Sequence, residues 1–434
     1  MMKENEPLEG LVREDLGNSS AASNLAFNEQ VKALIKTGRK VCHLAFGQSP
    51  FPAPECLTEA LKECAHITQY LPTQGIPELR EELVKFHERY DSLSLSAEGI
   101  VVGPGSKELI FLIMASFRGD ILLPAPSRPS FYSQSRLAGK VPRVLQTEQD
   151  QGWKLTPETL EKAAKQAAPG WKLLILTNPG NPSGTCYSEE ELQAISAVCR
   201  QRGVIVLSDE IYARLTFNRK HASMAKHFPE GTILTSGFSK WASVGGWRLG
   251  YAHFPSALRP LFEAVRNAAS HTYTNAPAPM QYGVAQVLKE NAEELDLYMT
   301  NCVRILQAVS DYCHRELGTV GVRGCKSQAG YYFMPDFEVV RKGLSVRGLT
   351  TGDHMTEAML EEANVALMAS SAFLRPADEL TCRLCFVCFD GSRALLALKD
   401  EPSKHLLSDE FLHKNCLPIV QGVQDLKKWV LKHQ

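Results

Sequence analysis

Polar residues able to bind or react stand directly behind several apolar stretches of this sequence. They lie in the segments GPGSK (103–107), NPGNPSGT (178–185), DEIY (209–212) and GFSK (237–240), with Arg248 close behind the last. These segments offer small residues that can surround an anion, an amide, a carboxylate, a phenol, an amine and a guanidinium. Ligands of open α/β sheets bind beyond the carboxyl ends of the strands. If the apolar stretches are strands, these groups share one site.

An anion and an aldehyde would both find partners in this set. Gly105, Ser106 and Lys107 opening a helix would present backbone amides to a phosphate, and Arg248 would add a cation. The amine of Lys240 could form a Schiff base with an aldehyde.

An aromatic ring with a basic nitrogen and a phenolic oxygen would be bound equally well. Asp209 can keep a pyridine nitrogen protonated, and Asn181 and Tyr212 can hydrogen-bond the ring oxygen. Together with the phosphate and aldehyde partners, these groups predict pyridoxal 5′-phosphate as the cofactor.

Three blocks of the sequence resemble one known family. NPGNPSGT (178–185), SDEIY (208–212) and SGFSKWASVGGWRLGY (236–251) are similar, in order and spacing, to the blocks of the fold-type I, class I/II pyridoxal-phosphate aminotransferases. The resemblance extends over roughly residues 40 to 395. It implies an enzyme that moves an amino group between an amino acid and a 2-oxo acid.

The resemblance also implies a role for individual residues. Lys240 would hold the cofactor and later move the substrate proton, and Asp209 would pair with the ring nitrogen, so both are expected to be catalytic. The residues expected to contact the cofactor are Gly105, Ser106, Lys107 through its backbone, Asn181, Tyr212, Arg248 and either Ser236 or Ser239, the latter preferred.

Further positions match the family's substrate and subunit contacts. Arg383, in CRLCFV, matches the arginine that binds the substrate α-carboxylate, for which a planar fork is suited. Gly47, in LAFGQSP, and Asn181 are expected beside that carboxylate. Tyr70 matches a tyrosine that reaches the phosphate in the neighbouring subunit, which implies a homodimer.

The sequence departs from the family pattern at two positions. The residue expected to stack on the cofactor ring is Arg128, so Phe131 or Tyr132 is an alternative stacking partner. The serine usually found three residues before the lysine is Gly237, which removes one phosphate hydroxyl. Both changes leave the Schiff base possible.

The elements that must position these residues are predicted from periodicity. Apolar runs such as 100–104, 173–178 and 204–209 alternate with amphipathic helical patterns, which is typical of a parallel sheet buried on both faces. We expect an α/β fold whose large domain holds a mostly parallel seven-stranded sheet between helices, with a smaller α+β domain. The expected divisions are an N-terminal arm at 1–57, a large domain at 58–318 and a small domain at 319–434.

Composition narrows the classes of partner. The 434 residues carry 47 Lys and Arg against 48 Asp and Glu, so no basic surplus favours nucleic acid. No apolar stretch is long enough for a membrane span, and the polar N-terminus does not resemble a secretory signal. The 12 cysteines then indicate free thiols in a cytoplasmic protein, and their spacing predicts no metal site.

Other functions remain open on the sequence alone. A C–S β-lyase or a cyclopropane-forming synthase would use the same lysine, aspartate and arginine. A catalytically inactive relative would also fit, given Arg128 and Gly237. A regulator that joins this scaffold to a DNA-binding module is disfavoured, because only about 40 residues precede the predicted body.

Overall fold

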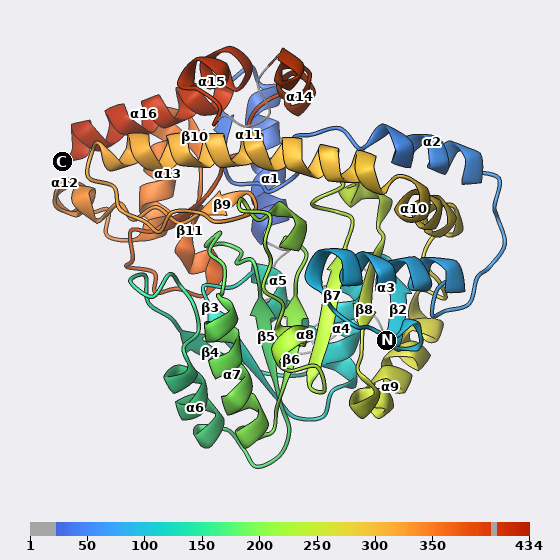
Figure 1. Ribbon diagram of the computed structural model, residues 1–434. Coiled ribbons are helices and arrows are strands. Elements are labelled where there is room, and N and C mark those ends of the chain that lie inside the picture. The colour runs from blue at the N-terminus through green and yellow to red at the C-terminus, as the bar shows by residue number, and fades with distance from the viewer. Residues whose placement is uncertain (1–22, 401–405) are drawn as a thin grey trace, which may run out of the picture.

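A seven-stranded sheet forms the centre of the computed structural model, which describes residues 23–400 and 406–434 (Figure 1). Its strand order is β2-β8-β7-β6-β5-β3-β4, and all neighbours are parallel except those that pair with β8. This confirms the predicted mostly parallel sheet. The strands are β2 (Ile100–Gly103), β3 (Asp120–Ala125), β4 (Arg143–Gln146), β5 (Lys172–Thr177), β6 (Val204–Asp209), β7 (Thr232–Gly237) and β8 (Gly250–His253).

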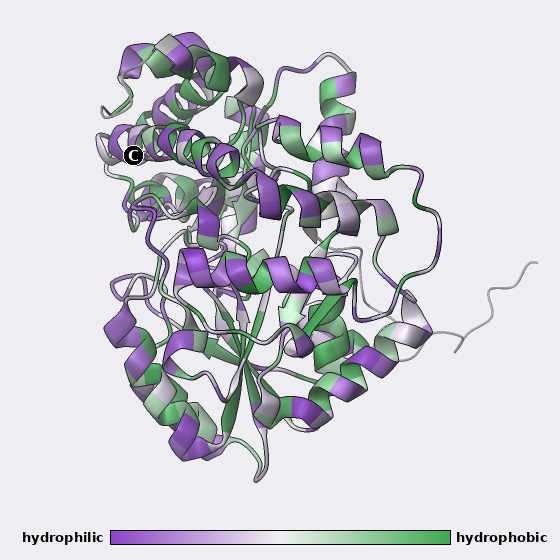
Figure 2. Cartoon of the chain, turned by 45° about the vertical axis from the view of Figure 1, so that its right-hand side comes forward, coloured by the Kyte–Doolittle hydropathy of each residue, from purple (hydrophilic) through white to green (hydrophobic). Residues whose placement is uncertain are grey.

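Both faces of the sheet are covered, which explains why consecutive residues in the middle of its central strands are apolar. In β5, Leu173 and Ile175 pack with helices α4 and α9, whereas Leu174 and Leu176 pack with α6 and α7 on the other face. Side chains alternate across a strand, so a sheet buried on both sides needs continuous apolar runs. Figure 2 shows these strands as hydrophobic and the outward helical faces as largely hydrophilic.

The helices follow most of the expected segments. Thr156 caps α6 and Ser188 caps α7, because each side chain accepts a hydrogen bond from a backbone amide of the first turn. The amphipathic helix α9 was not predicted, although Pro260 opens it. The helices are α1 (Ser23–Lys36), α2 (Glu55–Cys64), α3 (Pro77–Asp91), α4 (Ser106–Ser116), α5 (Pro129–Leu137), α6 (Pro157–Gln166), α7 (Glu189–Arg202), α8 (Met224–His227), α9 (Arg259–Thr272), α10 (Ala278–Glu290), α11 (Ala292–Gly318), α12 (Arg341–Val346), α13 (Gly352–Ala363), α14 (Gly391–Ala397), α15 (Asp409–Asn415) and α16 (Leu417–His433).

The last third of the chain forms a smaller α+β layer that lies beyond one end of the strands of the large sheet (Figure 1). Its short strands pair as β1-β10 and β11-β12-β9, with β1 (Cys42–His43), β9 (Tyr332–Phe333), β10 (Val365–Ala366), β11 (Met368–Ala369) and β12 (Cys382–Cys385). The strand expected over 329–337 is much shorter than predicted, because only Tyr332 and Phe333 find ladder partners. β1 pairs with β10 and so brings the N-terminal segment into this layer. The next residue, Leu44, accepts a hydrogen bond from the amide of Cys385 in β12, the strand that carries Arg383.

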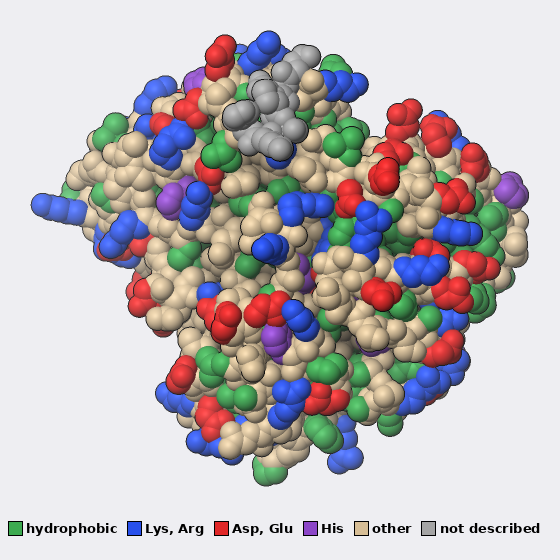
Figure 3. Space-filling view, viewed as in Figure 1, with side chains coloured by type: hydrophobic (Ala, Val, Ile, Leu, Met, Phe, Trp, Pro, Cys, Tyr) green, Lys and Arg blue, Asp and Glu red, His purple; other side chains and the backbone are tan. Residues whose placement is uncertain are grey.

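The face shown in Figure 3 carries acidic and basic side chains in mixture. This agrees with the near-equal numbers of the two signs in the sequence. None of the helices in the described part of the chain combines the length and the apolar composition that a membrane span requires.

Candidate active site

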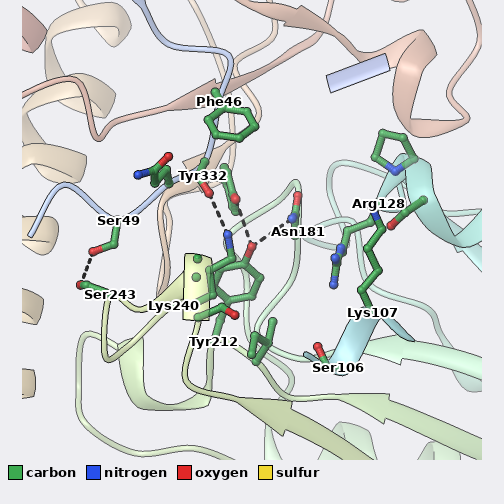
Figure 4. A pocket seen from close by; sticks show the side chains of 18 of the residues that line it. Phe46, Ser49, Ser106, Lys107, Arg128, Asn181, Tyr212, Lys240, Ser243 and Tyr332 are labelled. Carbon is green, nitrogen blue, oxygen red and sulfur yellow. Dashed lines mark hydrogen bonds between the residues drawn. The ribbon is translucent and has the colours of Figure 1, made fainter. Parts of the chain in front are cut away.

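A cavity of about 600 Å³ opens at the carboxyl ends of the central strands, where the short N-terminal strand and the C-terminal layer meet the large sheet. β5, β6 and β7 are parallel, so the residues that follow them lie at the same edge. The lining includes most of the predicted site residues: Gly47, Ser106, Lys107, Asn181, Tyr212, Ser239, Lys240, Arg248 and Arg383 (Figure 4).

Lys240 projects into this cavity from the loop that follows β7. Its Nζ donates a 2.7 Å hydrogen bond to the carbonyl oxygen of Gly47 and lies 5.8 Å from the ring centres of Tyr212 and Tyr331. The hydroxyl of Tyr331 donates to the backbone oxygen of Lys240 at 2.6 Å. Lys240 is therefore held by hydrogen bonds both at its backbone oxygen and at its amine.

A chain of hydrogen bonds crosses the floor of the cavity. The Nδ2 of Asn181 donates to the hydroxyl of Tyr212 at 3.1 Å, and that hydroxyl lies 3.0 Å from the hydroxyl of Tyr332. The Oδ1 of Asn181 accepts from Nη1 of Arg383 at 3.2 Å. Asn181 thus links the ring-oxygen partners expected from the sequence to the expected carboxylate partner.

The side chain of Arg383 is held by a backbone carbonyl oxygen and by two aromatic rings. It is 3% exposed, and its guanidinium lies 4.6 Å from the ring centre of Tyr332 and 4.8 Å from that of Phe373. Its Nη2 donates to the carbonyl oxygen of Ala45 at 2.6 Å, while its buried Nε has no hydrogen-bond partner. A guanidinium has five N–H donors, so donors remain for an incoming carboxylate.

The N-terminus of α4 forms the anion-binding end of the cavity. Gly105 has φ +88°, and a Cβ there would lie 2.8 Å from the Cζ of Arg248. A Cβ on Gly250 would lie 2.8 Å from the carbonyl carbon of Gly105. Glycine at both positions therefore permits the close approach of Arg248 and of the strand to the first turn of α4, where Ser106 is buried.

Lys107 stands next to this anion site at the mouth of the cavity and remains exposed. Partial burial, followed by the positive charges of Arg128 and Arg248, lowers the pKa of its ammonium. An additional negative charge placed among these cations would be attracted to them.

Asp209 ends β6 and is completely buried behind Arg128, which lines the cavity. Its Oδ2 accepts a 2.6 Å hydrogen bond from Nη1 of Arg128, whereas its buried Oδ1 has no hydrogen-bond partner. Burial raises the pKa of the Asp209 carboxyl, and the guanidinium of Arg128 opposes that rise. One oxygen of this carboxylate therefore has no hydrogen-bond donor in the structure.

The structure shows why glycine stands at position 237 and which nearby serine faces the cavity. A Cβ on Gly237 would lie 2.9 Å from the oxygen of Leu249 and 3.0 Å from the Cα of Gly250, so a larger residue would crowd the neighbouring strand. Ser236 is buried and its hydroxyl lies 3.4 Å from the oxygen of Glu210, whereas Ser239 lines the cavity. The geometry therefore favours Ser239 over Ser236 as the hydroxyl expected there.

Two expectations for the ring-stacking position differ from the structure. Phe131 is 1% exposed in the hydrophobic core, and neither it nor Tyr132 lines the cavity. The residue that enters the cavity is Arg128, whose guanidinium lies 5.0 Å above the ring centre of Phe131. Helix α5 begins at Pro129, so its periodicity turns Phe131 inward toward the sheet.

Tyr70 lies outside the cavity and is 86% exposed. Sequence reasoning also left several lining residues unassigned: Phe46, Ser49, Ile211, Ser243 and Tyr332. The position of Tyr332 beside Arg383 becomes evident only from the pairing of β9 with β12.

The donor set suits pyridoxal 5′-phosphate. The unpartnered Oδ1 of Asp209 can accept a hydrogen bond from a protonated pyridine nitrogen. The first turn of α4 with Arg248 can hold a phosphate, and Tyr212 with Asn181 can hold a ring oxygen. The amine of Lys240 faces the same space.

Comparison with known proteins agrees with this geometry. The family model "Aminotransferase class I and II" matches residues 39–390. An aspartate aminotransferase of Geobacillus stearothermophilus is 31% identical over 364 residues, which are 82% of this chain and 90% of the relative. An asparagine–oxo-acid transaminase of Streptococcus mutans is 28% identical over 81% of this chain and 89% of its own length.

The fold is also found among solved structures. The aspartate aminotransferase of Thermus thermophilus with maleate superposes with a TM-score of 0.80 at 24% identity, over 95% of this chain and 99% of the other. The aspartate aminotransferase of Rhizobium meliloti gives a TM-score of 0.79 at 20% identity, over 96% of this chain and 98% of the other.

Proposed function

Because the chain belongs to the class I and II aminotransferase family and is an aminotransferase, we propose that its cofactor is pyridoxal 5′-phosphate and its amino donor an acidic amino acid. The observation that carries the cofactor assignment is that Lys240 lines a cavity together with Arg128, whose guanidinium binds the buried, half-free carboxylate of Asp209 directly behind that lining. A cavity lined by several cations carries the assignment of the donor.

The residues of this chain divide the work of the transfer. When bound, the cofactor supplies an electron-withdrawing ring that makes the hydrogen on the substrate α-carbon acidic. Asp209 keeps the ring nitrogen protonated, and Asn181 and Tyr212 orient the ring through its oxygen. Arg383 binds the α-carboxylate of the substrate and so fixes which substituents of the α-carbon face Lys240.

Lys240 serves both to attach the cofactor and to move the proton. Its amine would hold the cofactor through a Schiff base, and the same amine, when free, would take the proton from the α-carbon of the substrate and return it to the cofactor. The hydrogen bond from its Nζ to Gly47 keeps the amine on the side of the cavity that carries Arg383.

The charges of the cavity favour a substrate with two carboxylates. The described residues that line it include no Asp or Glu, whereas Lys107, Arg128, Lys240, Arg248 and Arg383 are all basic. Arg248 is assigned to the phosphate, Arg383 to the α-carboxylate, and Arg128 is paired with Asp209. The ammonium of Lys107 remains, and it can bind a side-chain carboxylate.

Relatives with known names support the same substrate class. They include aspartate and asparagine transaminases, and the Thermus thermophilus structure holds maleate, a four-carbon dicarboxylate. A four-carbon amino acid would place its two carboxylates at opposite ends of the molecule, as Arg383 and Lys107 require.

A donor panel tests this proposal. The purified protein loaded with pyridoxal phosphate is mixed with single amino acids, and loss of the absorbance of the Lys240–cofactor imine is followed together with 2-oxo acid and ammonia. Aspartate is expected to react faster than alanine and to yield oxo acid without ammonia. Release of ammonia as the main product would instead indicate a lyase.

A Lys107→Met variant makes the panel specific. It removes the ammonium and retains the backbone amide at the first turn of α4. We expect kcat/KM for aspartate to fall, with an increase of about 2 kcal/mol in the corresponding activation free energy, which is the scale of a lost charge-assisted hydrogen bond. We expect little change for alanine. An equal fall for both donors would contradict the assignment of Lys107 to the side-chain carboxylate.

A homodimer completes the proposal. Tyr70 is a large aromatic residue left 86% exposed in the single chain, and it lies outside that chain's own cavity. Its place on the surface suits a side chain that enters the site of a second subunit.

A further inference from the structure

Arg128 occupies the position from which the cofactor ring is expected to be covered, yet it is bound to the residue that the ring nitrogen needs. Its Nη1 lies 2.6 Å from Oδ2 of Asp209, and the two residues are 81 positions apart in the sequence. The side chain of Arg128 is 19% exposed and that of Asp209 is fully buried. A cation and the catalytic carboxylate therefore form a desolvated ion pair at the edge of the cavity.

Several contacts hold Arg128 in this place. Pro129 follows it directly and restricts its backbone to the extended region, where it has φ −53° and ψ 131°. Its backbone oxygen accepts from the amide of Phe131 at 3.1 Å, and its guanidinium lies over the ring of the buried Phe131. Contacts therefore hold Arg128 at its backbone, on one face of its guanidinium and at Nη1.

The carboxylate of Asp209 has room for a second donor. Arg128 binds only Oδ2, and Oδ1 is buried without a hydrogen-bond partner. An orphaned acceptor of this kind costs free energy until a donor reaches it. A protonated ring nitrogen that reached Oδ1 would supply that donor, and the bond from Arg128 to Oδ2 would not need to break.

We propose that Arg128 remains bound to Asp209 when the cofactor is present, so that the carboxylate is shared between the guanidinium through Oδ2 and the ring nitrogen through Oδ1. Arg128 is then a positioning residue that acts through Asp209. Its planar guanidinium also covers the ring, in the place of the aromatic side chain expected there. The inference rests on the proposed cofactor.

Sharing the carboxylate has an electrostatic consequence. The guanidinium withdraws part of the negative charge that would otherwise stabilise the cationic ring, and it adds a positive charge nearby. Both effects disfavour the protonated form of the imine between Lys240 and the cofactor. Other charged and titratable groups line the cavity or lie close to the Lys240 amine, and they are unchanged in the variants below: Lys107, Tyr212, Arg248, Tyr331, Tyr332, Arg383 and Cys385.

The first experiment uses the protein without cofactor. The melting temperatures of Arg128→Gln, Asp209→Asn and the double variant are compared with that of the unmodified protein. Because each single change leaves one member of a buried pair without its partner, the loss in the double variant is expected to be smaller than the sum of the single losses. Additive losses would show that the pair does not form and would overturn the proposal, whether or not the cofactor binds.

The second experiment uses the loaded protein and reads the absorbance of the Lys240–cofactor imine against pH. Arg128→Gln is expected to raise the midpoint of this titration by about one pH unit, because a nearby cation is lost and Asp209 is released. Arg128→Lys, which retains the charge, is expected to leave the midpoint near that of the unmodified protein. A purely structural role for Arg128 would not separate these two variants.

A third measurement distinguishes an Arg128 that stays bound to Asp209 from an Arg128 that binds the substrate. If Arg128 leaves Asp209 and binds the substrate instead, Arg128→Gln raises KM for aspartate while the midpoint of the imine titration stays fixed. That result, or a crystal structure of the loaded protein with Arg128 turned away from Asp209, overturns the proposal. A protein that shows coupled melting but binds no pyridoxal phosphate would refute the cofactor assignment while leaving the ion pair established.

Discussion

The amine of Lys240 donates a 2.7 Å hydrogen bond to the carbonyl oxygen of Gly47, a residue 193 positions earlier in the chain. Gly47 follows β1 in the C-terminal layer, and Lys240 follows β7 of the large sheet. The bond joins the two parts of the molecule at the reacting amine. A change in the N-terminal segment is therefore expected to affect the chemistry directly.

Gly47→Ala tests this connection. A Cβ at residue 47 would overlap the hydroxyl end of Tyr332, which lies 3.0 Å from the hydroxyl of Tyr212. Displacement of these groups is expected to lower kcat/KM on the order of a hundredfold, as for a misplacement of about 1 Å. Gly246→Ala is the matched control, because it lines the same cavity and its Cβ would meet nothing within 4 Å. Equal activity of the two variants would count against the connection.

Lys240→Ala is expected to abolish both the imine absorbance and turnover, since no other amine forms the bond to the cofactor. Treatment of the loaded protein with borohydride, followed by peptide mass analysis, should place the reduced cofactor on residue 240. Lys107→Ala serves as the control, because it removes a neighbouring amine of the same cavity and should retain the adduct. An adduct on another lysine would refute the assignment.

Arg383→Ala is expected to weaken binding of the substrate α-carboxylate. Removal of a buried, charge-assisted pair costs about 2 to 4 kcal/mol, which raises KM by about 30- to 900-fold. Arg383→Lys should recover part of this loss, because it retains the charge but not the planar fork. Steady-state kinetics with aspartate measures the effect, and an unchanged KM would remove Arg383 from the substrate site.

Tyr70 can be assigned to its own or to the partner's site by mixing two impaired variants. In a hybrid of Tyr70→Ala and Lys240→Ala subunits, one site combines an intact Lys240 with a Tyr70 from the other subunit. If Tyr70 acts across the dimer, the hybrid regains cofactor affinity and activity relative to either variant alone. Mixtures that stay as impaired as their components would place Tyr70 in its own subunit or outside the site.

The lowered pKa of His253 predicts that the free energy of unfolding decreases in mild acid. His253 lies at the end of β8, and burial, together with the charge of His87, lowers its pKa from 6.5 to about 4. Between these pH values the unfolded chain binds a proton that the folded chain does not, so the free energy of unfolding falls as pH decreases from 6.5 to 4. The loss reaches about 3 kcal/mol at most.

Urea unfolding at a series of pH values measures this loss. His253→Gln should reduce the decline between pH 6.5 and 4 without abolishing it, because burial also lowers the pKa of His43 to about 4. His271→Gln, at an exposed position of α9, should leave the decline unchanged. If the decline is as steep in His253→Gln as in the unmodified protein, another group is responsible for it.

The sequence alone determined the sheet and much of the site, for local reasons. Strands buried on both faces need uninterrupted apolar runs, so β5 and β6 were evident, and parallel strands place the residues that follow them at one edge. Asp209 and Lys240 could therefore be assigned together. The capping residues Thr156 and Ser188 were equally local, because each bonds an amide in its own helix.

Only the tertiary structure decided how distant residues pair within the cavity. The sequence placed Arg128 near the cofactor but gave no sign that it binds Asp209, 81 positions away. Similarly, Tyr332 became part of the site only through the pairing of β9 with β12, which brings it against Arg383. Such contacts depend on strand register and on the packing of separate elements, which the type and spacing of neighbouring residues do not encode.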